Sequence, residues 1–558
     1  MEKTLDIRGT TVATASNVIS EDSRISLTYI SLAFVAIILG GLFGLLQALN
    51  RAGLLELPSW LNYYQILTAH GVLLVLVFSV LFVFGYFYAV LSRTLDGLVP
   101  AARKLGWTAL GIMLVGVGFV ATMIFLGEAS VMFTFYPPMR ASPWFYVGLF
   151  LLVFGIWIAV FGGYTQIFSW RKRNKGQHLP ILAFFAMGVF TLMFFGSLGV
   201  AAEVLMLIPW AFGWTETINV MLSRTLFWSF GHTFVNIWYL SAVSVWYVVV
   251  PRIIGGRLFS DTLIRVVVIL LVVSNIPGGF HHQIVDPAMT EGVKLIHAGM
   301  SMVIGFPSLM TAFAMFYVFD RAGRRKGAKG IFGWITKMPW GDVRFLAPMI
   351  AMIAFIAGGA GGIAQNANQL NQVVHNTLWI VGHFHLTVGV STVLTFFGIV
   401  YWLIPYLTKR ELTPQLNRLG VIQTLFWAAG MLIMTFSMSW VGVLGSPRRT
   451  SYSTYGDHAA ALNWDPYLLA VGIGGILLAI GGILMAYIVI QLLFFAPKGT
   501  TEFPIAAPED DGSITPKWTE RWGLWIVVML FIISFGYLFP IIDMVQNAPP
   551  GSPPFVTW

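Results

Sequence analysis

Long apolar runs separated by short polar segments make up most of the chain. Thirteen of these runs have the length that a helix needs to cross a bilayer. A membrane-spanning strand would be about half as long and would alternate in polarity, so the pattern predicts an all-α integral membrane protein. The predicted spans cover residues 28–49, 66–92, 106–127, 144–168, 181–208, 224–250, 262–279, 295–319, 344–363, 376–407, 419–441, 466–495 and 521–544.

The basic residues alternate from loop to loop. They gather in every second loop, as in "RKRNK" at 171–175 and "RAGRRKGAK" at 321–329. Because cytoplasmic loops carry an excess of Lys and Arg, we expect the N-terminus to face the cytoplasm. This predicts a cytoplasmic N-terminal segment at 1–27, a transmembrane core at 28–545 and a tail on the outer face at 546–558.

The composition narrows the possible chemistry. The chain is 57% hydrophobic and 10% charged, with a mean hydropathy of +0.80, which excludes a soluble globular protein. It has no cysteine, which excludes thiolate metal sites, iron–sulfur clusters and covalently attached haem within this chain. The net charge of +9 follows the loop alternation, so it indicates membrane topology and no nucleic-acid partner.

Six histidines fall at one depth, in the outer third of the predicted membrane. A single histidine in a membrane helix usually bonds a carbonyl group or lines a proton path. Independent structural histidines have no reason to share a depth, whereas a layer of metal sites does. The six are His70, His232, His281, His282, His383 and His385.

The spacing of these histidines indicates more than one metal. Residues two apart on a helix point about 200° away from each other, so His383 and His385 cannot bind one ion. Flat haems on the two sides of their helix would satisfy both side chains. We expect His281 and His282 to turn toward one ion, because "NIPGG" at 275–279 breaks the preceding helix. With His232 they would form a three-imidazole site, which suits copper.

These motifs resemble subunit I of the haem–copper oxidoreductase superfamily. The shared motifs are "FWSFGH", "FHHQIVDP", "VVHNT", "GHFHL" and "SPRR". Further motifs are similar to the B-type cytochrome oxidase branch, namely "FTFYPP" at 133–138, "PSLMTAF" at 307–313 and "GGAGGI" at 358–363. The resemblance runs from about residue 25 to the C-terminus.

The resemblance implies two haems, of b or a type, and one copper ion. It also implies the subunit I fold and the prokaryotic cytoplasmic (inner) membrane. The residue roles that it implies are His70 and His385 axial to a low-spin haem iron, His383 on a high-spin haem iron, His232, His281 and His282 on copper, and Arg448, Arg449 and His375 near the haem propionates. A plain helix cap is the alternative for His375.

The sequence departs from the oxidases at Asn236, four residues after His232. The resemblance predicts a tyrosine there, which supplies an electron when O2 is split. Splitting O2 takes four electrons in one step, of which iron gives two and copper one, whereas reducing 2 NO to N2O and water takes two. We therefore expect an NO-reducing offshoot of the B-type branch, with Asn236 at the catalytic site.

Two alternatives remain open at this position. One is a B-type cytochrome c or quinol oxidase that reduces O2 and takes its fourth electron from another residue, such as Tyr239 or Trp228. The other gives Asn236 only a packing role. The better-known NO reductases have a glutamate in place of this asparagine and a non-haem iron in place of copper. This chain lacks that glutamate, so copper remains the expected metal.

Proton delivery is predicted to be only partly like that of the B-type oxidases. Asn371 replaces an aspartate that lies four residues before the propionate histidine in that branch. Tyr247, Ser308 and Thr311 match its single proton channel, although each alone has the alternative of an ordinary packing hydroxyl. We expect protons for the chemistry to come from the cytoplasm, with weak or absent pumping.

The chain has no thiolate pair for a dinuclear copper entry site and no covalent haem, so electrons are expected to arrive from another subunit. A small membrane-anchored subunit with a copper or haem domain on the outer face would deliver electrons from cytochrome c, cupredoxin or quinol. Further small transmembrane subunits fit the same architecture. A secondary transporter is the alternative class, but such proteins usually show internal repeats around a midplane site, and this chain shows none.

Overall fold

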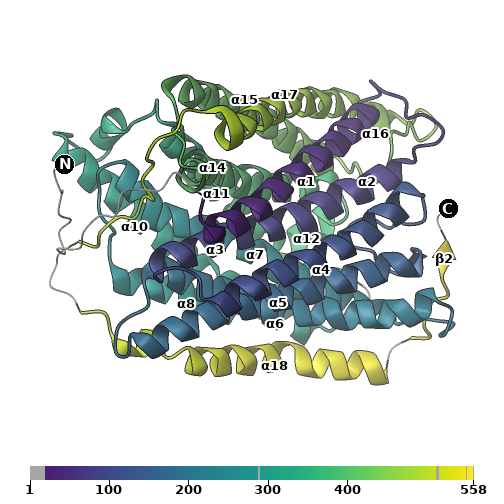
Figure 1. The fold of residues 1–558 in the computed structure, drawn as a ribbon. Helices are drawn as coiled ribbons and strands as arrows, with labels where there is room; N and C mark the ends of the chain where they lie inside the picture. The colour runs from purple at the N-terminus through teal and green to yellow at the C-terminus, as the bar shows by residue number, and fades with distance from the viewer. Residues whose placement is uncertain (1–18, 287–288, 510–513, 548, 557–558) are drawn as a thin grey trace, which may run out of the picture.

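The computed structural model describes residues 19–286, 289–509, 514–547 and 549–556. Within these ranges, thirteen helices are long and apolar enough to cross a membrane, which confirms the predicted fold class. The helices lie side by side in a single bundle, and their axes are roughly aligned with one another (Figure 1).

Several spans consist of more than one helical element. In chain order they are α1 (Glu21–Arg51); α2 (Tyr63–Gly71), η1 (Val72–Phe78) and α3 (Ser79–Thr94); α4 (Pro100–Phe125); α5 (Pro143–Arg173); α6 (Ile181–Ala211); α7 (Val220–Ile253); α8 (Asp261–Asn275) and η2 (Ile276–Gln283); α9 (Glu291–Val303) and α10 (Gly305–Arg325); α11 (Val343–Gln365); α13 (Leu378–Phe384), η4 (His385–Thr392) and α14 (Val393–Thr408); α15 (Pro414–Val443); α16 (Ala459–Leu462), α17 (Asp465–Ile490) and η5 (Gln491–Phe495); and α18 (Trp522–Gln546). Outside the spans lie η3 (Gly333–Lys337), α12 (Asn368–Val374), η6 (Lys517–Glu520), β1 (Met139–Arg140) and β2 (Phe555–Val556).

The helices extend beyond the apolar runs that predict them. Helix α1 begins at Glu21 because the Ser20 side chain accepts a hydrogen bond from the Ser23 N–H at 3.1 Å and caps the first turn. The predicted division between residues 27 and 28 therefore falls inside α1. Residues 1–18 of the predicted N-terminal segment, and 548 and 557–558 of the predicted tail, lie outside the described residues.

Irregular helical turns occur next to the histidines. The π-helical segment η1 begins two residues after His70, and a second one, η4, begins at His385. The 3₁₀ segment η2 carries His281 and His282. Such local changes in winding often mark functional sites, and they set the direction of the side chains that the site uses.

Small residues allow some helices to approach closely. A Cβ atom added at Gly116 of α4 would lie 2.6 Å from the Gly148 carbonyl oxygen of α5, and one added at Gly430 of α15 would lie 2.8 Å from the Gly474 carbonyl oxygen of α17. Small residues at these crossings are typical of helix packing in membranes, where close backbone contact provides much of the association energy.

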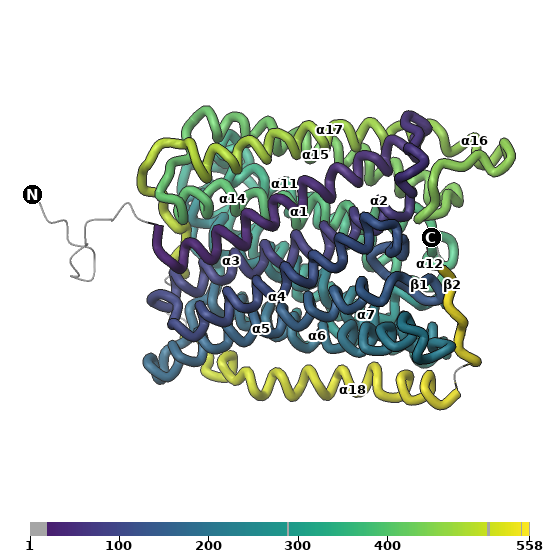
Figure 2. Tube along the Cα trace, turned by 45° about the vertical axis from the view of Figure 1, so that its right-hand side comes forward, coloured from purple at the N-terminus to yellow at the C-terminus, as the bar shows by residue number. Residues whose placement is uncertain are grey.

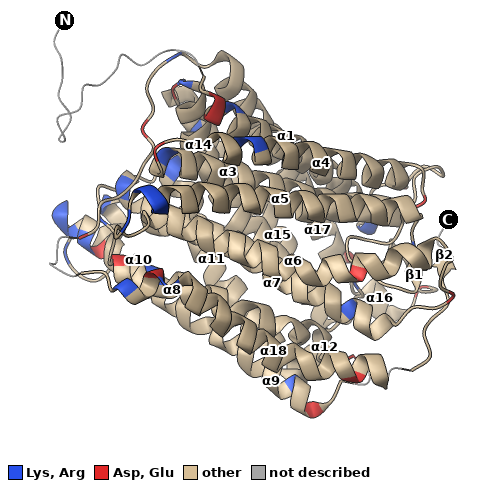
Figure 3. Cartoon of the chain, turned by 60° about the horizontal axis from the view of Figure 1, so that its bottom comes forward, with Lys and Arg blue, Asp and Glu red and all other residues tan. Residues whose placement is uncertain are grey.

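The two ends of the bundle differ. Lys and Arg gather at the end that carries the loops at 171–175 and 321–329 (Figure 3). At the opposite end, β2 pairs in parallel with β1, with Met139 beside Phe555 (Figure 2). The C-terminal strand is therefore held against the loop between α4 and α5.

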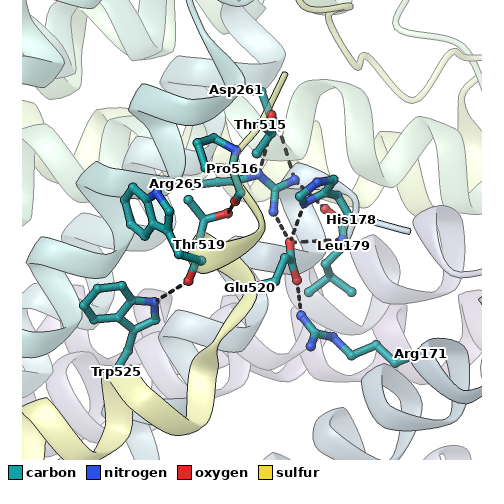
Figure 4. A network of polar contacts seen from close by, with 11 residues as sticks. Arg171, His178, Leu179, Asp261, Arg265, Thr515, Pro516, Thr519, Glu520 and Trp525 are labelled. Carbon is teal, nitrogen blue, oxygen red and sulfur yellow. Dashed lines mark hydrogen bonds and ion pairs between the residues drawn. The ribbon is translucent and has the colours of Figure 1, made fainter. Parts of the chain in front are cut away.

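Helix α18 lies along the edge of the bundle (Figure 1) and is anchored at its start by ion pairs that centre on the half-buried Glu520 (Figure 4). Glu520 of η6 accepts hydrogen bonds from Arg171 of α5 and Arg265 of α8. Arg265 is 2% exposed, and its Nε also donates to Asp261 at 2.6 Å. Glu520 accepts from the Leu179 N–H at 3.2 Å as well. This network fixes the N-terminal end of α18 to the bundle.

Candidate metal centres

The rings of His70 on α2 and His385 at the start of η4 face each other inside the bundle. Their ring planes are within 8° of parallel, and the ring centroids are 6.3 Å apart. Metal–imidazole bonds are about 2.0–2.1 Å long, so this separation has room for one metal ion between two ring nitrogens. The geometry fits a haem iron with these two residues as its axial ligands.

Both rings are held by backbone carbonyl groups. Nδ1–H of His70 donates to the Gly40 carbonyl oxygen at 2.8 Å, and Nδ1–H of His385 donates to that of Val381 at 2.9 Å. These bonds orient the rings and leave the Nε2 lone pairs for a metal. Gly44 of α1 is required beside them, since a Cβ there would lie 2.7 Å from the His70 ring.

His232 of α7, His281 and His282 form the one cluster of metal-ligand type that is found among the described residues. Their ligand atoms all lie within 4.8 Å of one another. The Nε2 atoms of His232 and His282 are buried without a protein partner, a costly state unless a ligand or metal occupies the space. The donor set of three imidazoles suits copper.

The side chain of Ser301 on α9 orients His281. Its Nδ1 lies 2.6 Å from Ser301 Oγ, and this hydroxyl donates to the His297 carbonyl oxygen at 2.8 Å. With the hydroxyl proton in that bond, the His281 tautomer that carries its proton on Nδ1 would donate to Ser301. The Nε2 lone pair of His281 is then available to a metal.

The irregular turn η2 is shaped by the glycines that precede these histidines. A Cβ at Gly278 would lie 2.8 Å from His232 Nε2, and a Cβ at Gly279 would lie 2.9 Å from the Trp228 carbonyl oxygen. Only glycine therefore allows η2 to lie this close to α7. The Trp228 ring stacks on the His282 ring, with centroids 3.8 Å apart and planes within 6°.

His383 faces away from His385, as their spacing predicts. It points toward α11, where a Cβ at Gly361 would lie 2.8 Å from its Nδ1. That nitrogen is buried and has no protein partner. Trp379, one turn earlier on α13, has its ring nearly parallel to that of His383 at 5.7 Å. The residue is placed to serve a second group on the other side of the α13–η4 segment from His70.

Asn236 lies one turn after His232 on α7 and is half-buried. Its Nδ2 donates to the His232 carbonyl oxygen at 3.0 Å. The bond holds the amide against its own helix and uses one of its two N–H groups. The second N–H and the carbonyl oxygen can still serve a bound molecule.

The predicted propionate residues lie in a charged cluster with four residues that the sequence did not single out. His375 lies 3.1 Å from Asn371 Oδ1 through Nδ1, and 3.6 Å from the carboxylate of Asp286 through Nε2. The added residues are Asp286, Arg224, Asn376 and Tyr136. Asp286 stands within the quoted motif "FHHQIVDP", so the motif itself was the signal for it.

The arginines of this cluster lack a matching number of acidic partners. Arg224 pairs with Asp286 at 2.9 Å, whereas Arg448 donates to the neutral Asn376 side chain at 2.7 and 3.1 Å, and Arg449 lies over the Tyr136 ring. Burial and the neighbouring charge of Arg449 lower the pKa of Arg448 to about 9. Added carboxylates would relieve this repulsion, so the cluster fits haem propionates.

The predicted proton-path residues lie between α7 and α10, together with a further tyrosine. Tyr239 of α7 donates to Ser308 Oγ of α10 at 3.4 Å. Ser308 and Thr311 also donate to carbonyl oxygens of their own helix. The Tyr247 hydroxyl is buried without a hydrogen-bond partner. The sequence alone indicates Tyr239 only as an alternative electron donor, because its contact with α10 joins segments that are far apart in the chain.

Comparisons with known proteins decide the family. The sequence model of the family described as cytochrome c and quinol oxidase polypeptide I matches residues 24–477. This chain belongs to that family. As a member of the haem–copper oxidase subunit I family, it is an oxidoreductase of a multi-subunit membrane complex, and the family normally binds haems and copper.

Individual relatives of this oxidase family cover most of the chain. Cytochrome c oxidase subunit 1 of Thermus thermophilus is 35% identical over 536 residues, which are 92% of this chain and 94% of the relative. Quinol oxidase subunit 1 of Bacillus subtilis is 24% identical over 84% of this chain and 71% of its own length. A cryo-EM structure of a heme-copper terminal oxidase dimer superposes with a TM-score of 0.92 and 31% identity, and covers 97% of this chain and 96% of that chain.

Proposed function

We propose that this chain is the catalytic subunit of a nitric oxide reductase, an offshoot of the B-type oxidases that converts 2 NO, two electrons and two protons to N2O and water. One observation carries the proposal: Asn236 stands where the resemblance predicts a redox-active tyrosine. An amide side chain cannot give up an electron. NO reduction requires no such residue, whereas splitting O2 does.

Six imidazoles are the proposed holders of the cofactors. His70 and His385 would hold the low-spin haem, His383 the high-spin haem, and His232, His281 and His282 the copper ion. When bound, these groups supply the electrons for the reduction. We assign the haem propionates to Arg448, Arg449 and His375. The excess of positive charge among these residues supports this assignment.

We assign proton delivery to the hydroxyl groups between α7 and α10. Tyr247, Ser308 and Thr311 form the path, and Tyr239 joins it through its bond to Ser308. Because Asn371 cannot carry a proton as an aspartate would, protons for the chemistry enter from the cytoplasm and pumping is weak or absent. Asn236 would hold the last proton-bearing water next to the substrate.

The proposal extends to location and partners. The protein lies in the prokaryotic cytoplasmic membrane, with a cytoplasmic segment at 1–27, the catalytic core at 28–545 and an outer tail at 546–558. The gathering of Lys and Arg at one end of the bundle supports this orientation (Figure 3). A membrane-anchored subunit with a copper or haem domain on the outer face delivers the electrons, with further small transmembrane subunits as additional partners.

A cytochrome c or quinol oxidase that reduces O2 is the second candidate. The names of the relatives favour it, since the Thermus thermophilus protein is a cytochrome c oxidase subunit. Two aromatic residues offer the missing electron in that case. Trp228 stacks on His282 at 3.8 Å, and Tyr239 lies three residues after Asn236 on α7.

Steady-state assays of the purified complex with one electron donor and both gases separate the two candidates. We expect fast conversion of NO to N2O, and O2 reduction that is slow or releases partly reduced oxygen. Fast, complete four-electron reduction of O2 with negligible N2O would overturn the NO reductase. Tyr239→Phe and Trp228→Phe would then identify the electron donor, since the replacement of the donor lowers the O2 rate.

A further inference from the structure

A further histidine, His297 on α9, is buried close to the copper site without belonging to its donor set. It is 1% exposed, and its Nε2–H donates to the Gly536 carbonyl oxygen of α18 at 2.8 Å. One turn later on α9, Ser301 contacts His281 at 2.6 Å and the Gly278 carbonyl oxygen at 3.2 Å. Helix α9 therefore links α18 to the turn that carries two of the proposed copper ligands.

Helix α18 also touches this turn directly. The Tyr537 ring stacks on Phe280 with centroids 5.1 Å apart, and its hydroxyl lies against Gly279, where an added Cβ would overlap it. A Cβ at Gly536 would be 3.4 Å from Pro277 and 3.6 Å from His297. On α18 these contacts come from Gly536, which accepts the hydrogen bond of His297, and from the next residue, Tyr537.

The turn η2 depends on such outside support. Its 3₁₀ winding gives poorer hydrogen bonds than an α-helix, Pro277 removes a donor, and Gly278 and Gly279 add backbone freedom. Helix α18 is peripheral, since only 22% of its most apolar stretch is buried, the smallest share among the thirteen spans. It also lies beyond the stretch at 24–477 that matches the family.

We propose that α18 is a strut for the copper site and that His297 is a positioning residue, which transmits the location of α18 to His281 and His282. The strut is fixed at one end by Glu520 (Figure 4) and contacts η2 through Gly536 and Tyr537. The inference rests on the proposed copper site, and it concerns how that site is held and not which gas it reduces.

Two pairs of variants test the strut. His297→Leu removes the N–H donor to Gly536, whereas His297→Gln keeps a donor at nearly the same reach. Gly536→Val adds two methyl groups beyond a Cβ that would already be in van der Waals contact with Pro277 and His297, so it crowds the contact between α18 and these residues. Gly523→Val is its matched control, because a Cβ at Gly523, on the first turn of the same helix, meets nothing within 4 Å.

The measurements report on the metal site without turnover. Copper per haem is measured during competition with a chelator, and the infrared band of carbon monoxide at copper is recorded after photolysis from haem. His297→Leu and Gly536→Val are expected to bind copper about 10- to 100-fold more weakly and to shift the band. His297→Gln and Gly523→Val stay close to the parent, and the low-spin haem spectrum is unchanged in all four variants.

The outcomes distinguish this inference from the proposed function. Parent-like copper affinity and an unshifted band in both His297→Leu and Gly536→Val would overturn the strut while leaving the copper site intact. A parent complex with no copper in this subunit would overturn the copper assignment and the strut together. If His297→Leu fails to assemble, the comparison of Gly536→Val with Gly523→Val is decisive. Equal loss of copper affinity in these two variants would also contradict the strut.

Discussion

Asn236 shows how one side chain limits the chemistry of the site. Its amide is tied to the His232 carbonyl oxygen at 3.0 Å, so it moves with the helix that carries a proposed copper ligand. It can donate a hydrogen bond or hold a water, but it cannot supply an electron. The side chain therefore contributes position and protons to the proposed reaction.

Replacement of this amide tests that role. Asn236→Ala is expected to lower N2O formation by about 10²-fold or more, as for the loss of a positioned proton donor. Asn174→Ala is the control, because Asn174 makes the same bond to the residue four before it, at 3.0 Å, in a loop at the other end of the bundle. NO turnover of Asn236→Ala within a few-fold of the parent would show a packing role only.

At the level of the helices, the two histidines whose rings face each other, His70 and His385, come from helices that are far apart in sequence. His70 lies on α2 and His385 on η4, and π-helical turns begin at or just after both. The close approach of α1 at Gly44 keeps the His70 ring in place. A cofactor between them would join two parts of the bundle that are not neighbours in the chain.

Removal of one of these ligands tests the pairing. His70→Ala is expected to lose the low-spin haem, since six-coordinate iron needs both imidazoles, while the copper triad and His383 on other helices remain. The reduced-minus-oxidised spectrum measures this loss, with His458→Ala, an exposed loop histidine that caps α16, as the control. A full low-spin band in His70→Ala would contradict the assignment.

At the scale of the whole molecule, ion pairs that include the buried Arg265 hold the peripheral helix α18 on the bundle. Glu520 joins η6 to Arg171 and Arg265, and Arg265 is 2% exposed (Figure 4). A buried charge that loses its partner is costly, whereas an exposed pair contributes little. The network therefore matters for assembly of the thirteen helices more than surface pairs do.

This difference predicts the effect of two matched substitutions. Glu520→Ala is expected to lower the free energy of unfolding by about 3 kcal/mol or more, because Arg265 stays buried with one partner fewer. Glu502→Ala, which removes the exposed pair with Arg252, should cost less than about 1 kcal/mol. Thermal unfolding of the purified variants measures both, and equal melting temperatures would contradict a structural role for the network.

The sequence by itself determined the spans and the local geometry of the site. Hydrophobic length against bilayer thickness sets the number of helices, and all thirteen predicted spans are present. Helix geometry alone places His383 and His385 on opposite faces, and Pro277 with two glycines alone predicts the broken turn. These features depend only on backbone hydrogen bonds and residue size, which act over a few residues.

Only the tertiary structure decided which distant groups meet. The contacts of Tyr239 with Ser308, of Asp286 with Arg224 and His375, and of His297 with Gly536 join segments that are 62 to 239 residues apart. Apolar helices in a membrane are nearly equivalent in hydropathy, so their neighbours are chosen by shape, by close approach at glycines and by a few polar pairs. That information lies in the packed surfaces of the helices and not in the apolar pattern along the chain.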